Sequence, residues 1–233
     1  MSSGVKPRSD GGGRRPLPHI FGSLASTFTR AVCMLCLEKG IEYRLIEVPL
    51  GSPELRAIGP LGQMPGLRHG NFTLFESKAI ATYLDTTFPH PRLIPQDSRR
   101  LGQTEQWVSF VNTHLDPLLI RNFLVTHIRA AAAGKSVDID QVGPLLTRIR
   151  ADLEFLDRSL EAGFLVGGEL TFADLNLAPL LDRMTLVPSS RELLQTLPNL
   201  SDFHARMSSR GSFRATIPPP GPPPRFATDH AEA

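Results

Sequence analysis

The sequence predicts a chain in two parts, an α/β unit of order strand–helix–strand, hairpin and helix, followed by an all-helical unit. Short apolar runs and alternating apolar residues between residues 18 and 75 favour strands, whereas from residue 98 onward apolar residues recur only at helical spacing. A proline-containing stretch, residues 91–97, separates the two patterns. We expect domains at residues 16–90 and 98–217, with this stretch as the linker.

The amino-acid composition is that of a folded globular protein. Of the 233 residues, 41% are hydrophobic and 21% are charged, which is too apolar for a disordered chain. No apolar run reaches the roughly 18 residues that a membrane span requires. We therefore expect that the chain is not an integral membrane protein.

The net charge argues against nucleic acid as a partner. Residues 1–15 hold four basic residues and one acidic residue, and residues 218–233 hold one basic and two acidic residues, so the two ends together carry the formal net charge of +2. The interior is neutral, so the basic surface expected of a nucleic-acid-binding domain is missing. No apolar stretch near the N-terminus resembles the core of a signal peptide, and we expect a cytoplasmic protein.

Both ends of the chain are predicted to be disordered. Residues 1–15 include three consecutive glycines, and residues 218–224 include six prolines, which cannot continue a helix or a sheet. We therefore expect residues 1–15 and 218–233 to lie outside the folded part.

The first unit begins with a short apolar run at residues 19–22, which predicts a strand. The helix after it is predicted by apolar residues at i, i+3, i+4, i+7 and i+8, namely Phe28, Ala31, Val32, Leu35 and Cys36. Lys39-Gly40 ends this helix. Residues 43–48 alternate like a second strand, and we expect the two strands to be parallel.

A hairpin and a helix complete the first unit. Residues 66–69 and 72–74 flank Gly70-Asn71, a pair that favours a tight turn. Residues 77–88 then show helical spacing.

The second unit is predicted to be helical over residues 101–129, 139–160, 172–184 and 200–210. The start of the third helix has a capping box, in which Thr171 is the N-cap and Asp174 reaches back to its N–H group. Leu170 and Leu175 are spaced for a hydrophobic staple.

Four segments resemble those of one enzyme family. In chain order they read FGSLASTFTR at residues 21–30, LGQMP at 61–65, LFESKAI at 74–80 and FLVGGELTFADL at 164–175. Over about residues 18–215 the chain resembles a glutathione transferase, closest to the phi and theta classes, in which a serine activates the thiol. The resemblance implies a thioredoxin-like βαβ-ββα domain followed by an all-helical domain. It also implies glutathione as co-substrate, a small apolar electrophile, a homodimer and no metal.

Ser26 matches the catalytic serine of that family. A thiol with a pKa near 8.5 is mostly protonated at neutral pH, and both a hydroxyl donor and a helix N-terminus favour its thiolate. We expect Ser26 to donate a hydrogen bond to the sulfur of glutathione. Its alternative role is that of an N-cap without a catalytic duty. Ser23 and Thr27 are the nearest substitutes.

The resemblance also assigns residues to glutathione binding. Met64-Pro65 is expected to be a cis peptide that presents the backbone of Met64 to the cysteinyl unit, with Gln63 beside it. Glu76 and Ser77, at the start of a helix, are expected to bind the γ-glutamyl group.

One departure from the family concerns the glycine carboxylate of glutathione. Phi-like relatives bind it with a His-Lys pair, but the shorter segment 49–55 lacks this pair. Arg56 is the only nearby cation, so it either substitutes for the pair or glutathione binds more weakly.

The electrophile pocket is expected to include Leu24, Ala25, Phe110 and His114, by analogy with the family. Trp107, Val111 and Leu118 share the helical spacing of Phe110 and His114, so part of this set belongs to the core. A histidine on such a face is more often packed than catalytic.

The pair Cys33 and Cys36 forms a CxxC motif, which suggests dithiol redox chemistry. A reactive first cysteine lies at a helix N-terminus, however, and Cys33 lies about two turns inside the predicted helix. We therefore expect both cysteines to be packing residues.

Two activities besides conjugation are compatible with the sequence. One is that of a glutathione-binding or ligand-carrying protein with little turnover, and the other is that of a glutathione-dependent peroxidase or reductase.

Overall fold

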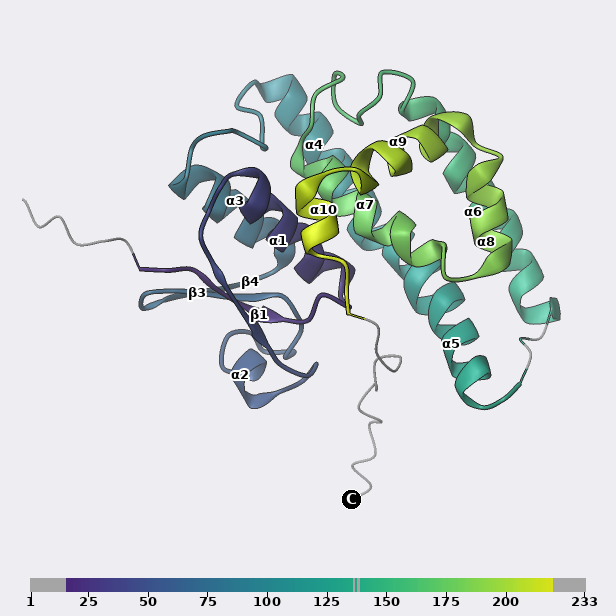
Figure 1. Cartoon of the computed structure of the whole chain (residues 1–233), viewed down its shortest axis with the longest axis horizontal. Coiled ribbons are helices and arrows are strands. Elements are labelled where there is room, and N and C mark those ends of the chain that lie inside the picture. Colours follow the sequence, from purple (N-terminus) through teal and green to yellow (C-terminus); the bar gives the residue numbers. More distant parts are fainter. Residues whose placement is uncertain (1–15, 136, 138, 220–233) are drawn as a thin grey trace, which may run out of the picture.

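The computed structural model describes residues 16–135, 137 and 139–219 (Figure 1). The predicted tail 1–15, and residues 220–233 of the other predicted tail, lie outside the described residues. No helix in the described part of the chain is long and apolar enough to cross a membrane.

A four-stranded mixed sheet of order β2-β1-β3-β4 forms the base of the first unit. Its strands are β1 (His19–Gly22), β2 (Arg44–Glu47), β3 (Gly66–His69) and β4 (Phe72–Phe75). β1 pairs with β2 in parallel and with β3 antiparallel, and β3 and β4 form the hairpin. The predicted strands, their directions and the hairpin are therefore confirmed.

Helices cover both faces of this sheet. Ile20 packs into the main core with α1 (Thr27–Glu38) and α3 (Ser77–Thr87), which lie on one face (Figure 1). The next residue, Phe21, points to the other face and packs with Leu55 of α2 (Pro53–Arg56) and with Ile58. The alternation of side chains along one strand thus separates the two cores.

The second unit is helical, as predicted. α4 (Ser98–Phe110) continues through a π-helical segment (Val111–Leu124) into α5 (Val125–Ala132). The other helices are α6 (Ile139–Ser159), α7 (Phe172–Met184), α8 (Pro188–Gln195), α9 (Pro198–Ser208) and α10 (Gly211–Ala215). The predicted limits of the domains stay a prediction, although no helix or strand lies between Thr87 and Ser98.

Three short helices were not expected from the sequence: α2, α8 and α10. They contain 4, 8 and 5 residues, too few for a repeating apolar pattern to distinguish a helix from a turn. Pro53 and Pro188 stand at the first positions of α2 and α8, which is a common helix start.

α7 is the central helix of the second unit and packs directly against α1 (Figure 1). All of its 13 residues are buried except Asp182 and Arg183. At its start, the carboxylate of Asp174 accepts the N–H of Thr171 at 2.8 Å, so the predicted capping box is confirmed. α7 therefore brings two charged side chains to the helix that carries Ser26 at its N-cap.

Candidate functional site

Three loops that contain predicted site residues meet at one end of the sheet. In the strand register, Phe21 of β1 lies opposite Gly66 of β3, and Gly66 lies opposite Phe75 of β4. The loop after β1, the loop before β3 and the turn after β4 therefore leave the sheet side by side. Sequence motifs about 50 residues apart are thereby brought to one place.

Gly22 allows the closest approach at this end of the sheet. Its φ is 155°, and a Cβ there would lie 2.6 Å from Oγ1 of Thr29 and 3.2 Å from Cβ of Met64. Any side chain would push apart the first turn of α1 and the loop of Met64. Gly22 was not singled out in the sequence, although it lies within the first motif.

Ser26 is the N-cap of α1. Its Oγ accepts the N–H of Thr29 at 3.3 Å, and its own N–H donates to the carbonyl of Ser23 at 2.9 Å. Ser26 therefore caps α1, and its catalytic role stays a prediction. No acceptor among the described residues takes the hydroxyl proton of Ser26, so this proton is available to a ligand at the helix N-terminus.

The Met64-Pro65 peptide is cis, as predicted. Pro65 is buried, Met64 is half-buried and Gln63 is exposed. Met64 lies just before the first paired residue of β3, Gly66, so its backbone polar groups stand beyond the ladder between β1 and β3.

Glu76 and Ser77 form the start of α3. Glu76 has a φ of 69°, a left-handed conformation that is unusual for a residue other than glycine and is found at ligand sites. Ser77 is the first residue of the helix and is buried, whereas Glu76 is exposed. No side chain caps α3, so the N–H groups of its first turn are suited to an anion.

Arg56 lies in α2, near the loop that leads to Gln63. Its Nε donates to the carbonyl of Gly51 at 3.0 Å, and its side chain packs beside Gly62. It is exposed, and no carboxylate of the described residues forms an ion pair with it. Its positive charge is therefore not neutralised locally.

The residues predicted for the electrophile pocket make contacts with different helices. His114 Nε2 lies 2.9 Å from Asp152 Oδ2 on α6, and its ring stacks on Phe110 at 4.9 Å. The carbonyl of Ala25 instead accepts a hydrogen bond from a residue of α7. Hydrogen bonds and ring contacts of the described residues thus do not join Phe110 and His114 to Leu24 and Ala25, and this pocket stays a prediction.

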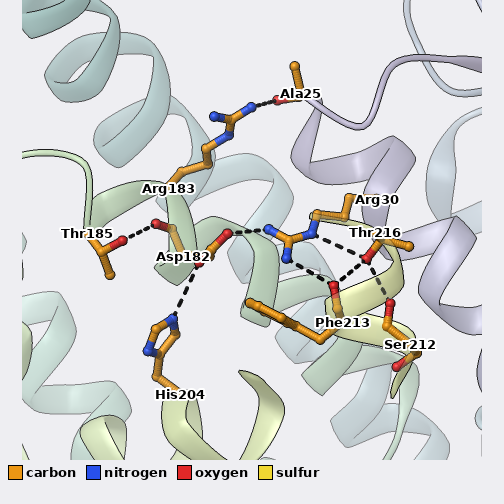
Figure 2. Close-up of polar contacts among 9 residues, drawn as sticks. All are labelled: Ala25, Arg30, Asp182, Arg183, Thr185, His204, Ser212, Phe213 and Thr216. Atoms are coloured by element: carbon orange, nitrogen blue, oxygen red, sulfur yellow. Dashed lines mark hydrogen bonds and ion pairs between the residues drawn. The ribbon is translucent and has the colours of Figure 1, made fainter. Parts of the chain in front are cut away.

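Arg183 is a site residue that the sequence reasoning missed. Its Nη2 donates to the carbonyl of Ala25, the residue before Ser26, at 2.7 Å (Figure 2). The adjacent Asp182 forms an ion pair with Arg30 of α1. A signal was present in the sequence, because Asp182-Arg183 is a charged pair in the last turn of a helix that is mostly apolar.

The two cysteines are unsuited to thiolate chemistry. Both are fully buried inside α1, and burial raises the pKa of Cys33 to about 12. Burial also raises the pKa of Cys36 well above its ordinary value. The predicted packing role of both residues is confirmed by their burial.

Two models of protein families match the chain. The model of "Glutathione S-transferase, N-terminal domain" matches residues 20–92, and that of "Glutathione S-transferase, C-terminal domain" matches residues 124–206.

Individual proteins are similar over most of the chain. A glutathione S-transferase of Dianthus caryophyllus is 30% identical over 162 residues, which are 67% of this chain and 72% of that protein. Glutathione S-transferase F12 of Arabidopsis thaliana is 26% identical over 84% of this chain and 94% of its own length. A crystal structure of a glutathione S-transferase from Methylobacillus flagellatus with glutathione bound is 26% identical, with a TM-score of 0.70, over 86% of this chain and 99% of that one.

Proposed function

Because the chain belongs to the glutathione S-transferase family, we propose that it transfers the thiolate of glutathione to small apolar electrophiles and that Ser26 stabilises this thiolate. The observation that carries the proposal is the position of Ser26 at the N-terminus of α1, with its hydroxyl proton unused by the described residues. The helix N-terminus and the hydroxyl both stabilise a negative charge that lies close to them.

Glutathione would lie across the three loops at the end of the sheet. The N–H and carbonyl of Met64 would pair with its cysteinyl unit, as a strand pairs with a sheet edge. The first turn of α3 and the Ser77 hydroxyl would bind the γ-glutamyl carboxylate, with Glu76 at its ammonium group. Gln63 and Arg56 would contact the rest of the tripeptide, and Arg56 would face the glycine carboxylate.

The reaction needs few steps. The thiol of bound glutathione would lose its proton to solvent, and the thiolate would receive a hydrogen bond from Ser26. The sulfur then forms a bond to the electrophilic carbon, and the displaced group leaves with the electrons of its bond. The electrophile would contact Leu24, Ala25, Phe110 and His114. A homodimer and a cytoplasmic location remain part of this proposal.

The test is the variant Ser26→Ala. Removing a hydrogen bond to a charged group costs about 1.5–3 kcal/mol, so turnover of an aryl halide at neutral pH should fall about ten- to hundredfold. Glutathione binding, measured by calorimetry, should change little because other residues hold the tripeptide. Unchanged turnover would remove Ser26 from this role.

Ser23→Ala is the matched comparison, because Ser23 lies in the same loop and its hydroxyl accepts the N–H of Ala25. If Ser23→Ala abolished turnover and Ser26→Ala did not, the thiolate donor would be Ser23.

A carrier of glutathione or its conjugates is the second candidate, favoured by the missing His-Lys pair and by the contact of Arg56 with Gly51. The same two measurements distinguish it from an enzyme. A carrier would bind glutathione in the calorimeter and show no turnover in the wild-type protein.

A further inference from the structure

The peptide group that leads into Ser26 is held on both sides. On one side, Arg183 donates to the carbonyl of Ala25 at 2.7 Å. On the other, the N–H of Ser26 donates to the carbonyl of Ser23 at 2.9 Å. These two bonds restrict the orientation of the planar Ala25–Ser26 peptide. The N–H of Arg30 donates to the carbonyl of Ser26 at 3.0 Å and so holds the next peptide. With the peptides on both sides of its Cα held, the Cα–Cβ bond of Ser26 has a defined direction.

The carbonyl of Ala25, the residue before the N-cap, accepts no N–H of α1. The first hydrogen bond of this helix runs from the N–H of Arg30 to the carbonyl of Ser26, one residue later. Ala25 therefore depends on a donor from another part of the chain. That donor comes from α7 in the helical unit, 158 residues away.

Arg183 is carried by a rigid support. The neighbouring Asp182 forms an ion pair with Arg30, whose side chain is 1% exposed (Figure 2). Arg30 also donates to the carbonyl of Phe213 at 3.3 Å and stacks on its ring at 4.1 Å. These contacts join α1, α7 and α10 next to Arg183, so the end of α7 from which its side chain extends is held against α1.

We propose that Arg183 is a positioning residue for Ser26, which it directs toward the sulfur of glutathione by fixing the Ala25–Ser26 peptide. The inference rests on the proposed function, because it assigns Arg183 an effect that passes through the Ser26 hydroxyl. A guanidinium also suits this task chemically, since a charged donor makes a stronger bond to a carbonyl than a neutral one.

The test compares Arg183→Met, which keeps most of the side-chain length and removes the donors and the charge, with the wild type. The measured quantity is the pKa of the thiol of bound glutathione, obtained from thiolate absorbance and from the pH profile of kcat. We expect Arg183→Met to raise this pKa by about half a unit to one unit, so that turnover below the pKa falls about three- to tenfold. The loss should vanish at high pH, where glutathione is ionised in either protein, and the KM for glutathione should stay within about twofold.

A double-mutant cycle with Ser26→Ala separates positioning from the direct effect of a nearby positive charge. If Arg183 acts through Ser26, Arg183→Met adds almost nothing to the thiol pKa in the Ser26→Ala background. If the charge itself stabilises the thiolate, the two effects add, and the proposal is overturned. It is also overturned if only the KM of the electrophile changes, since Arg183 would then be a binding residue.

Arg210→Met is the matched control. Arg210, the N-cap of α10, makes bonds of 2.7 Å to both carboxylate oxygens of Glu38 at the far end of α1, so its loss weakens another contact of α1 without touching Ser26. We expect it to lower stability and to leave the thiol pKa unchanged. Equal effects of Arg183→Met and Arg210→Met on that pKa would show that Arg183 has only a structural role, and would overturn the proposal.

Two further comparisons keep the result interpretable. Should Arg183→Met fail to fold, Arg183→Lys replaces it, because lysine keeps a charged donor. A thiol pKa nearer to that of the wild type than to that of Ser26→Ala then supports the proposal. A pKa as high as in Ser26→Ala contradicts it. If Ser26→Ala alone leaves the thiol pKa unchanged, the proposed role of Ser26 fails first, and this outcome is distinct from additivity in the cycle.

Discussion

Lys39 Nζ lies 2.7 Å from Asp85 Oδ1, and both side chains are buried. Lys39 ends α1 as its C-cap, and Asp85 belongs to α3. The same carboxylate oxygen accepts the N–H of Leu93 at 2.9 Å, and Lys39 also donates to the carbonyl of Pro91. One buried ion pair thus joins both helices on one face of the sheet to the segment that leads into the helical unit.

We predict that Asp85→Ala lowers the free energy of unfolding by about 3–5 kcal/mol, because it leaves the ammonium group of Lys39 buried without its counter-ion. The double variant Lys39→Met with Asp85→Leu should be clearly more stable than Asp85→Ala, since no buried charge is left. Urea unfolding of these proteins measures both effects. A double variant no more stable than Asp85→Ala would contradict this account of the buried pair.

Ser77→Ala tests the proposed anchor of glutathione. The hydroxyl of Ser77 would act equally on bound glutathione and on the transition state, so its loss should raise the KM for glutathione about five- to tenfold and leave kcat nearly unchanged. Calorimetry should show the matching loss of affinity. The control is Ser98→Ala, which changes the first residue of α4 and therefore only a helix start. An unchanged affinity after Ser77→Ala would place the γ-glutamyl group elsewhere.

The pH dependence of stability should reveal Asp174. Burial raises the pKa of this carboxyl to about 6, against the opposing effect of hydrogen bonds from Leu165 and Thr171. Between about pH 4 and pH 6 the folded protein therefore keeps a proton that the unfolded chain has lost, and stability from this group decreases as pH rises through that window. As pH rises through this window, the free energy of unfolding of Asp174→Asn should increase relative to that of the wild type by up to roughly 3 kcal/mol. Urea unfolding at several pH values measures this difference.

Asp182→Asn should change the pH dependence in the opposite direction. Burial opposes ionisation of Asp182, but His204, whose Nε2 lies 3.8 Å from Asp182 Oδ1, and the hydrogen-bonded Arg30 hold the pKa of Asp182 below its ordinary value. Its carboxylate therefore stabilises the fold above the pKa of the unfolded chain, and this contribution is lost on acidification. Identical pH profiles of the two variants would contradict both assignments.

Replacing both Cys33 and Cys36 by Ala should leave conjugation per folded molecule intact. The sulfur that reacts would come from glutathione, and both thiols of the protein are fully buried. Stability should fall by about 2 kcal/mol because two small apolar groups are removed from the core. A collapse of activity after correction for the unfolded fraction, with Ser26→Ala harmless, would instead support dithiol chemistry.

Several elements follow from the sequence alone because they depend on local rules. The hairpin follows from Gly70-Asn71 and its flanking apolar residues, and β3 occupies the predicted residues 66–69. The helix at Phe172–Met184 has its predicted limits because a capping box and a long apolar pattern lie within one stretch of chain. The motifs also identified Ser26 as a residue at a helix N-terminus and Met64-Pro65 as a cis peptide. The hairpin and the capping box each result from the interaction of a few neighbouring residues, whereas Ser26 and the cis peptide were expected from the resemblance of the motifs.

How these segments act together depends on the tertiary structure. The strand register brings Ser26, Met64 and Ser77 to one end of the sheet, and no local pattern contains that information. The bond between Arg183 and Ala25 joins residues 158 positions apart, and it exists only because α7 packs on α1. Such a contact depends on how two finished helices fit against each other, which is a property of their packing in space and not of the spacing of residues along the chain.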